Sequence, residues 1–361
     1  MQIPLVLVGD YVALNPKTAL FERPRQDYEE IVRFLGGELC CTNHHHTPFF
    51  SFVRRIDKRL KIDLLAAFLA SQHISRYNSV LSTSEKLAIP LAMLSYFKRV
   101  PVPHVVIAHK LSSGLKTSLF RTWPLHHQFH HIISVCRPQA EYAVTRLGFT
   151  KEQVDFIYDK VDHLFFCPQN KPVDDYILAV GMEQRDYPTL TQALEDTDIR
   201  VVILAKSPWS SHQVRTETAA NVTYVTKRLS YLELRDLYAR ARMVVIPLNN
   251  VDYAAGVNSV LEAMAMAKPL VVTQTAGIDD YLRADETGLF AAPHDSTHLR
   301  EQILGLWHNQ QQQQRLAANA RQMVEEQMNL DIYVQNIVRI TQGATAVFHK
   351  KRTAPNQLPI S

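Results

Sequence analysis

The sequence predicts an α/β protein built from two Rossmann-like domains, with a helical C-terminus. Its 361 residues exceed the ~250 to 300 residues at which a single hydrophobic core usually stops growing. Short apolar runs rich in β-branched residues alternate with amphipathic helical stretches, as parallel sheets require. The alternation restarts after FFCPQNKPVDD, a polar stretch with two prolines that is typical of a linker. We therefore predict a first domain over residues 1–168, a second over 169–345, and a basic tail, 346–361, that we expect to be disordered.

Within each domain the strands alternate with helices along the chain. In the first domain, apolar runs predict strands over residues 4–8, 78–82, 104–108, 131–135 and 154–158. Helical periodicity covers residues 25–35, 51–70, 84–98 and 137–147. In the second domain, we expect strands over residues 176–180, 201–205, 222–225, 243–247 and 269–273. Helical periodicity then runs from about residue 295 to 343.

The composition is that of an ordinary globular protein, with 46% hydrophobic and 20% charged residues. No apolar run approaches the ~18 residues of a membrane-spanning helix, and the N-terminus lacks the basic region and cleavage pattern of a signal peptide. The four cysteines show neither paired spacing nor the density of a disulfide framework, which favours a reducing compartment, so we expect a cytoplasmic protein. The 16 histidines include adjacent pairs but no metal-ligand spacing, so we expect no metal site.

Glycine motifs that bind phosphate do not follow the first strand of either domain. The two turns read VGDYVAL and VGMEQRD, each with a single glycine, which argues against an NAD-type dinucleotide site and a P-loop. A bound phosphate would then be held by helix N-termini and basic side chains. The stretch GVNSVLEAMAMAKPLVV, residues 256–272, meets that condition, because it reads as a helix start followed by a buried strand.

A lone carboxylate, Glu262, lies in this stretch among small and apolar residues. We expect the helix to begin near Val257, which leaves the backbone N–H groups of Gly256, Val257 and Asn258 free to bind an anion at the carboxyl edge of a parallel sheet. Glu262 lies about one and a half turns further along. It is either a functional acid or a surface or capping carboxylate, and its apolar neighbours favour the functional role.

The run SVLEAMAMAKPLVVTQTAGIDDYLRADETGLFAAPHD resembles the most characteristic segment of the retaining glycosyltransferases of family 4. Less specific similarities extend over residues 77–330. The resemblance implies the GT-B fold, in which an N-terminal acceptor-binding domain and a C-terminal donor-binding domain face each other across a cleft. It also implies an enzyme that moves a sugar from a nucleotide-sugar to an acceptor with retention of anomeric configuration. The nucleotide-sugar is then a co-substrate, and no cofactor or metal is expected.

In that family, the glutamate matched by Glu262 accepts hydrogen bonds from ribose hydroxyls, which suits a carboxylate because it offers acceptors only. The residues expected to bind the donor are Gly256, Val257, Asn258, Ser259, Glu262, Arg185, Lys206 and Arg228. Those expected to take part in catalysis are His109, Arg185 and Glu262. Arg185 would neutralise the departing diphosphate, unless it pairs with Asp186 instead. Lys206 and Arg228 read equally well as surface charges.

In the first domain, His109 follows a predicted strand at its carboxyl end, where parallel sheets place ligands. The resemblance puts the matching histidine near the transferred sugar, so His109 is expected to contact the acceptor too, with an ordinary loop histidine as the alternative. Asp10 matches a position that contacts the acceptor. Two departures from the family affect sugar and diphosphate recognition: Ala254 stands where a second glutamate is usual, and Met182 or Glu183 where an arginine is usual.

The expected partners are a UDP- or GDP-sugar and a sugar, lipid-linked or small-molecule acceptor. Residues 44–137 carry 13 Lys and Arg against 3 Asp and Glu, a net charge of +10. The stretch SFVRRIDKRLKIDLLAAF, residues 51–68, is typical of a helix that docks on an anionic membrane, and equally of a core-packed helix with a solvated basic face. Peripheral binding at the inner face of the membrane is thus one of two interpretations of this stretch. The basic stretch lacks a recognition-helix or interleaved aromatic pattern, so no nucleic acid is expected.

Two other functions stay open. A nucleotide-sugar epimerase on the same scaffold would convert the donor without an acceptor. A catalytically degenerate protein would bind the nucleotide-sugar without transferring it, and the departures from the family pattern, Ala254 above all, keep this alternative in view.

Overall fold

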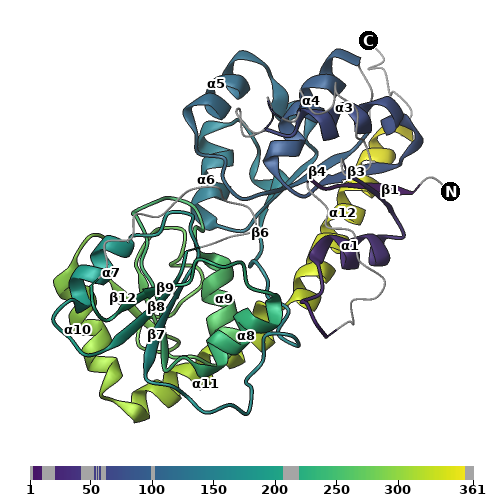
Figure 1. The fold of residues 1–361 in the computed structure, drawn as a ribbon. Helices are drawn as coiled ribbons and strands as arrows, with labels where there is room; N and C mark the ends of the chain where they lie inside the picture. The colour runs from purple at the N-terminus through teal and green to yellow at the C-terminus, as the bar shows by residue number, and fades with distance from the viewer. Residues whose placement is uncertain are drawn as a thin grey trace. The chain divides into compact units, whose positions relative to one another are not determined.

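The chain divides into two compact α/β units. The computed structural model describes residues 3–9, 21–41, 53, 55, 57, 62–98, 102–205 and 219–353. The first unit comprises residues 1–15, 26–157 and 334–361, and the second comprises residues 16–25 and 158–333. Each unit holds its own six-stranded sheet with helices packed against it (Figure 1). The predicted fold class, two Rossmann-like halves with a helical C-terminus, is confirmed.

All strand pairs of the first sheet are parallel. The strand order is β2 (Glu38–Cys40), β1 (Pro4–Leu7), β3 (Ser79–Ser82), β4 (His104–Ala108), β5 (His131–Ser134) and β6 (Val154–Phe156). The inner strands are buried on both faces, which is why they read as continuous apolar runs in the sequence. The five predicted strands are confirmed, whereas the edge strand β2 was missed because none of its residues is buried and no apolar run marks it.

The helices of the first unit are α1 (Asp27–Leu35), α3 (Leu64–His73), α4 (Glu85–Lys98), α5 (Gly114–Thr122) and α6 (Arg137–Arg146). The prediction of one helix over residues 51–70 was wrong, because residues 62–63 are not helical. The Asp57 carboxylate accepts hydrogen bonds from the N–H groups of Leu64, at 2.9 Å, and Leu65, at 3.2 Å. These bonds satisfy free donors at the start of α3, so a new helix begins there.

The second sheet is also parallel and follows the order β12 (Leu289–Ala291), β11 (Leu270–Thr273), β10 (Met243–Ile246), β7 (Tyr176–Val180), β8 (Arg200–Leu204) and β9 (Val222–Tyr224). The chain winds outward from β7 in one direction and from β10 in the other. The order therefore reverses between β7 and β10, which makes this pair the topological switch point of the sheet. Short β12 was the one strand of this sheet that the sequence did not reveal.

The helices that begin in the second unit are α7 (Tyr187–Leu194), α8 (Tyr231–Arg240), α9 (Val257–Ala265), α10 (Ser296–Trp307), α11 (Gln310–Gln327) and α12 (Leu330–Thr353). The helical stretch expected over residues 295–343 is thus three helices. Asn309 separates the first two, because its side chain accepts a hydrogen bond from the N–H of Gln312 at 3.0 Å and starts a new helix.

Helix α12 begins in the second unit and ends in the first. Near its end, the Phe348 ring lies 4.7 Å from that of His130, and His349 Nε2 lies 3.2 Å from the carbonyl oxygen of Asn78. The expectation of a disordered tail from residue 346 was wrong up to Thr353, where the helix ends; residues 354–361 lie outside the described part. These contacts also explain why residues 334–345, assigned by the sequence to the second domain, group with the first unit.

Candidate functional site

Two loops meet at the carboxyl edge of the second sheet, one after β7 and one after β10. Open α/β sheets bind ligands at such a switch point. The N–H of Asp186 donates to the carbonyl of Pro247 at 3.1 Å, and that of Asn249 donates to the carbonyl of Gln184 at 2.9 Å. An antiparallel bridge between Arg185 and Leu248 lies between these bonds. The backbone thus fixes Arg185 against the loop that leads to α9.

Arg185 folds back over the end of its own strand. Nε donates to the carbonyl of Val180 at 2.8 Å, Nη1 to the carbonyl of Glu183 at 2.7 Å, and Nη2 to Oγ of Ser259 at 3.0 Å. Gly181 has φ of 108°, and a Cβ there would collide with the guanidinium. Glycine is therefore required for Arg185 to lie in this place.

Arg185 has no ion-pair partner in the part of the chain that the structure describes. Among the described residues, no carboxylate lies within 4.0 Å of its guanidinium nitrogens. The sequence alternative, a pair with Asp186, is wrong: the Asp186 carboxylate accepts from the N–H and Oγ1 of Thr189, at 3.3 and 2.7 Å, and lies 2.8 Å from Nδ1 of His294. Asp186 caps α7, so the cation at the switch point stays available to an anion.

The start of α9 lies beside this cation. Gly256 has φ of 84°, and a Cβ there would lie 3.1 Å from Nη1 of Arg185. The N–H of Val257 donates to the carbonyl of Ala254 at 3.3 Å, contrary to the expectation that it is free. The N–H groups of Asn258 and Ser259 donate to no residue in the described part of the chain. Free amides at a helix N-terminus, next to an arginine with no ion-pair partner among the described residues, are an arrangement that suits an anion.

Glu262 occupies the same face of α9, one turn after Ser259. Its Oε2 accepts a hydrogen bond from the hydroxyl of Tyr238 in α8 at 2.9 Å. Burial raises the pKa of Glu262 to about 7, although the Tyr238 bond and the charge of Arg185 act to lower it. A half-buried acid with one hydrogen-bond donor among the described residues is not an ordinary surface carboxylate, and its second oxygen accepts no bond from them and could accept one from a ligand.

The turn after β11 packs closely against the loop after β10. A Cβ on Gly277 would lie 2.6 Å from the backbone nitrogen of Ala254 and collide with the carbonyl group of Tyr253. The Tyr253 hydroxyl donates to Oε1 of Glu183 at 2.8 Å. The Glu183 carboxylate, in the loop after β7, therefore contacts the residue that precedes Ala254. On the same loop, a depression of about 380 Å³ is lined by Asn250, Val251, Asp252 and Ala276.

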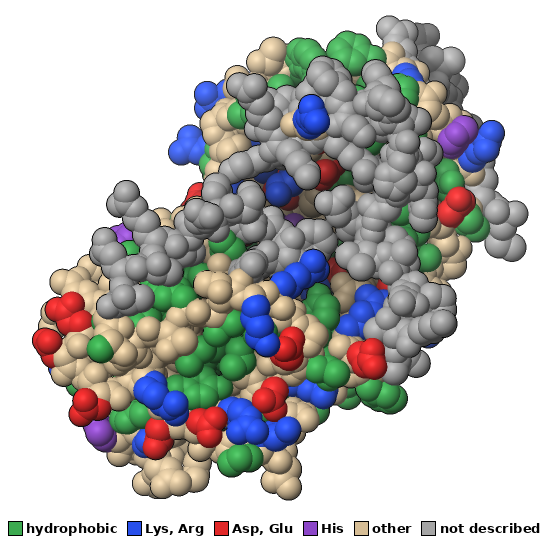
Figure 2. Space-filling view, in the orientation of Figure 1, with side chains coloured by type: hydrophobic (Ala, Val, Ile, Leu, Met, Phe, Trp, Pro, Cys, Tyr) green, Lys and Arg blue, Asp and Glu red, His purple; other side chains and the backbone are tan. Residues whose placement is uncertain are grey.

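Lys206 and Arg228 are the other two basic residues that the sequence assigns to the donor site. Lys206 lies outside the described residues. Arg228 is exposed and lies just before α8, where Ser230 and Glu233 form a capping box. The pKa of Tyr231 is raised by burial and by the charge of Glu262, and Arg228 opposes that rise. Arg228 and Glu262 therefore act on the same aromatic side chain. On the face of the second unit that Figure 2 shows, the coloured basic and acidic side chains are interspersed.

In the first unit, His109 follows β4 directly, as expected. Its N–H donates to Oε2 of Glu85 at 3.1 Å, and Nζ of Lys116 donates to Oε1 at 3.0 Å. The His109 side chain is 42% exposed. Burial acts to raise the pKa of Glu85, but the contacts with His109 and Lys116 hold it well below its usual value. Glu85 anchors the loop and leaves the imidazole accessible, whereas Asp10 lies outside the described residues.

Sequence reasoning missed Tyr238, Glu85 and Gly277. Tyr238 reaches Glu262 from 24 positions away in the chain, and no local pattern marks such a pair. Among the described residues, no group of three or more His, Cys, Asp or Glu side chains could hold a metal ion. In that same part of the chain, no helix has both the length and the apolar content needed to cross a bilayer.

The region that builds this site is matched by a known family. Residues 178–309 match the family model of glycosyl transferases group 1. The match covers the Arg185 loop, Tyr238, the start of α9 and Glu262, whereas His109 and Glu85 lie outside it.

Curated relatives cover less than half of the chain. The chain is 27% identical to O-antigen chain mannosyltransferase C of Escherichia coli over 174 residues, which are 46% of this chain and 46% of that protein. It is 29% identical to glycogen synthase of Mycobacterium tuberculosis over 154 residues, 42% of this chain and 34% of that enzyme. The chain thus matches less than half the length of these relatives. None of them is named as an epimerase, so that alternative is not favoured.

Solved structures support the fold over nearly the whole chain. HepE of Anabaena in complex with UDP-glucose has a TM-score of 0.70 at 13% identity, covering 95% of this chain and 100% of that one. A glycosyltransferase of Rickettsia africae has a TM-score of 0.68 at 12% identity, covering 95% and 98%. At these identities the likeness concerns the fold alone.

Proposed function

We propose that this protein is a glycosyltransferase that moves a sugar from a UDP- or GDP-sugar to an acceptor hydroxyl with retention of configuration. One observation carries the proposal: Arg185, Ser259 and Glu262 converge at the switch point of the second sheet, beside the free amides of α9. The match to group 1 glycosyl transferases over the same residues supports it. The second unit would bind the donor and the first the acceptor.

Glu262 is the residue we assign to the ribose. Its free carboxylate oxygen can accept hydrogen bonds from the two vicinal hydroxyls, while Tyr238 keeps the other oxygen in place. Two hydroxyl donors favour the ionised acid, so nucleotide binding should lower the pKa of Glu262 from about 7.

Arg185 and α9 are the groups we assign to the diphosphate. A guanidinium carries five N–H donors, and three bonds to Val180, Glu183 and Ser259 leave donors for a phosphate. The amides of Asn258 and Ser259 would add neutral donors at the positive end of the helix. We assign the remaining donor contacts to Gly256, Lys206 and Arg228.

In the transfer step, the bond between the anomeric carbon and the diphosphate oxygen breaks, and its electron pair stays on the diphosphate. The acceptor oxygen bonds to the anomeric carbon from the same face, and its proton passes to the departing diphosphate oxygen. Arg185 and the α9 amides would stabilise the charge that develops there. We assign His109 to the transferred sugar and acceptor, with Asp10 also contacting the acceptor. No cofactor or metal takes part in this scheme.

A lipid-linked acceptor would bring the protein to an anionic membrane. Helix α3 exposes Leu64 (41%) and Phe68 (45%) one turn apart, and it follows the basic stretch of residues 54–61 in the sequence. Apolar side chains beside cations are the combination that interfacial helices use. Of the basic residues in that stretch, Arg55 is described and exposed. Salt-sensitive sedimentation with anionic vesicles, absent with neutral ones, would support this placement.

A thermal-shift panel of nucleoside diphosphates and their sugars tests the donor site. A ligand at 100 times its Kd stabilises the folded state by roughly 2.7 kcal/mol. We expect one diphosphate to raise the Tm and Glu262→Ala to abolish that rise. Incubating the stabilising nucleotide-sugar with candidate acceptors, and reading the new anomeric signal by NMR, tests transfer and retention. Absence of any nucleotide effect would refute the proposal.

A further inference from the structure

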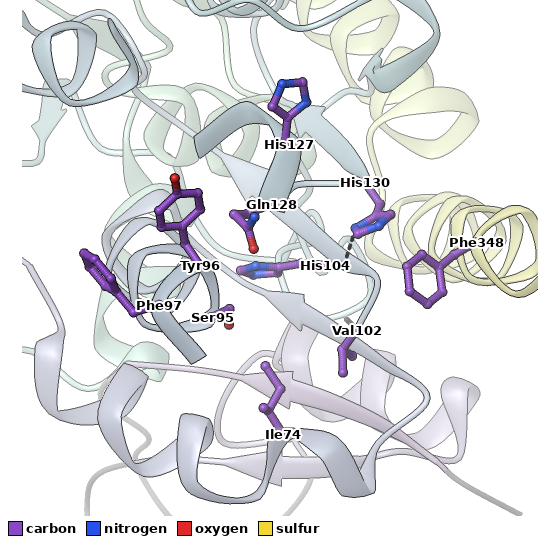
Figure 3. A pocket seen from close by; sticks show the side chains of 10 residues that line it. All are labelled: Ile74, Ser95, Tyr96, Phe97, Val102, His104, His127, Gln128, His130 and Phe348. Carbon is purple, nitrogen blue, oxygen red and sulfur yellow. Dashed lines mark hydrogen bonds between the residues drawn. The ribbon is translucent and has the colours of Figure 1, made fainter. Parts of the chain in front are cut away.

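The first unit contains a pocket that the proposed transfer does not use. Its volume is about 560 Å³. Figure 3 shows its lining, which is Ile74, Ser95, Tyr96, Phe97, Val102, His104, His127, Gln128, His130 and Phe348. His104 is the first residue of β4, so the pocket lies at the amino end of the strand whose carboxyl end carries His109. It is therefore separate from the edge to which the acceptor was assigned.

The His104 imidazole lies at the centre of this group and is only 4% exposed (Figure 3). Nε2 lies 2.8 Å from Oγ of Ser82, and Nδ1 has no hydrogen-bond partner among the described residues. Burial, with a smaller effect of His130, lowers the pKa of His104 to about 3. The ring is therefore neutral, and Nδ1 offers one hydrogen bond to an occupant of the pocket.

A second polar atom in the lining has no partner. Ser95 is 7% exposed, and its Oγ is buried without a hydrogen bond to any described residue. Buried hydroxyls are normally paired, so the unpaired Ser95 hydroxyl beside this pocket is a second group to which a ligand can bond. His104 and Ser95 lie on different elements, β4 and α4, and both line the same space.

The rest of the lining sets the chemistry of the occupant. Tyr96, Phe97 and Phe348 supply aromatic walls, and Phe97 is 65% exposed at the rim. None of the lining residues that the structure describes is Asp, Glu, Lys or Arg. A charged ligand would lose its hydration here without gaining a carboxylate, ammonium or guanidinium counter-charge from them. The pocket therefore suits an uncharged ring that carries hydroxyl groups on one side and apolar surface on the other.

We propose that this pocket binds an uncharged sugar unit of the acceptor or product glycan, away from the site of transfer. The choice of a glycan over another neutral ring rests on the proposed function. Such a site would hold a growing chain to the first unit while its end is extended, which raises the effective concentration of the acceptor.

The test measures binding of maltotriose and of an α-linked mannotriose by saturation-transfer NMR, with indole as a neutral ring without hydroxyls. We expect a trisaccharide to bind and indole not to compete with it. Ser95→Ala should raise Kd by roughly fivefold, the effect of losing one hydrogen bond, without lowering the Tm. Phe97→Ala should weaken binding further. Phe34→Ala is the matched control, since Phe34 is 52% exposed on α1, does not line the pocket and should leave binding unchanged.

The outcomes of this test distinguish failure of the glycan-pocket proposal from failure of the transferase proposal. No trisaccharide binding, or binding unaffected by both Ser95→Ala and Phe97→Ala, overturns the glycan pocket, as does displacement of the sugar by indole. A nucleotide-induced Tm rise in the same protein would show that the transferase proposal survives that failure. Trisaccharide binding without any nucleotide effect would instead leave the pocket standing and remove the transferase proposal.

Discussion

The hydroxyl of Tyr238 donates to Oε2 of Glu262 over 2.9 Å, which links α8 to α9 beneath the carboxyl edge of the second sheet. The bond holds one carboxylate oxygen and directs the other away from Tyr238. Because burial raises the pKa of Glu262 to about 7 and the Tyr238 bond acts against that rise, the pair sets how much of the acid is ionised near neutral pH.

Tyr238→Phe should therefore weaken nucleotide binding in a pH-dependent way. Without the hydroxyl, the pKa of Glu262 rises further, so at pH 7 less of the acid is ionised and the Kd for the stabilising diphosphate should rise roughly fivefold to tenfold. Calorimetric titration at pH 7.0 and 8.5 should show the defect shrinking at the higher pH. Tyr176→Phe is the control, because its hydroxyl donates to the Leu237 carbonyl at 2.7 Å, not to Glu262. An equal defect at both pH values would argue for a merely structural role.

The unliganded protein should lose stability as pH rises, through Glu262. Its pKa is about 7 in the folded state against 4.5 as the ordinary value, so the stabilising contribution is complete below pH 4.5 and is lost as pH rises through 7. The shift corresponds to at most about 3 kcal/mol. Urea unfolding of wild type and Glu262→Gln between pH 4.5 and 8 should show the difference in unfolding free energy changing over that window. A pH-independent difference would contradict the raised pKa.

Arg185→Lys should impair the diphosphate site although the charge is kept. Lysine cannot make the three divergent bonds to Val180, Glu183 and Ser259 and still present donors to a phosphate. We expect a rise in Kd of about tenfold or more, with a loss of stability of about 1–3 kcal/mol. Arg242→Lys is a suitable control, since Arg242 pairs with Asp175 and the Trp307 carbonyl. Its nucleotide affinity should stay at the wild-type value.

Gly277→Ala should damage the site without touching a ligand. The added Cβ would lie 2.6 Å from the Ala254 nitrogen, so the loop after β10 must move away, and α9 with it. We expect a loss of about 1–3 kcal/mol in unfolding free energy, the usual effect of overpacking, together with weaker nucleotide binding. Gly305→Ala in α10 has no atom within 4 Å of its Cβ and should stabilise the protein by about 0.5–1 kcal/mol. Wild-type affinity in Gly277→Ala would show that the loop tolerates the shift.

The sheets could be read from the sequence because buried parallel strands leave continuous apolar runs. Strands such as β4 and β10 are buried along their length and carry that signal, whereas the edge strand β2 has no buried residue and begins with Glu38, so it leaves no apolar run. Helix ends depend on single side chains, which is why the bonds from Asp57 that begin α3 were not foreseen.

The site was predictable only as far as it is local. Glu262 and the start of α9 lie within seven positions of each other and share one motif, so the sequence could propose both as candidates. The partner Tyr238, the bonds of Arg185 to its own strand and the support from Gly277 depend on how separate segments pack. The hydrophobic periodicity of the sequence does not indicate such contacts. The alternative of a pair between Arg185 and Asp186 is wrong for the same reason, since the Asp186 carboxylate caps α7.

Because α12 starts in one unit and finishes in the other, neither half can be obtained by a single cut. A fragment ending at residue 157 would lack the helical turns that carry Phe348 and His349, and with them one wall of the pocket around His104. Expression of isolated halves would therefore need the last twenty-eight residues, 334–361, joined to the amino-terminal piece by an engineered connection.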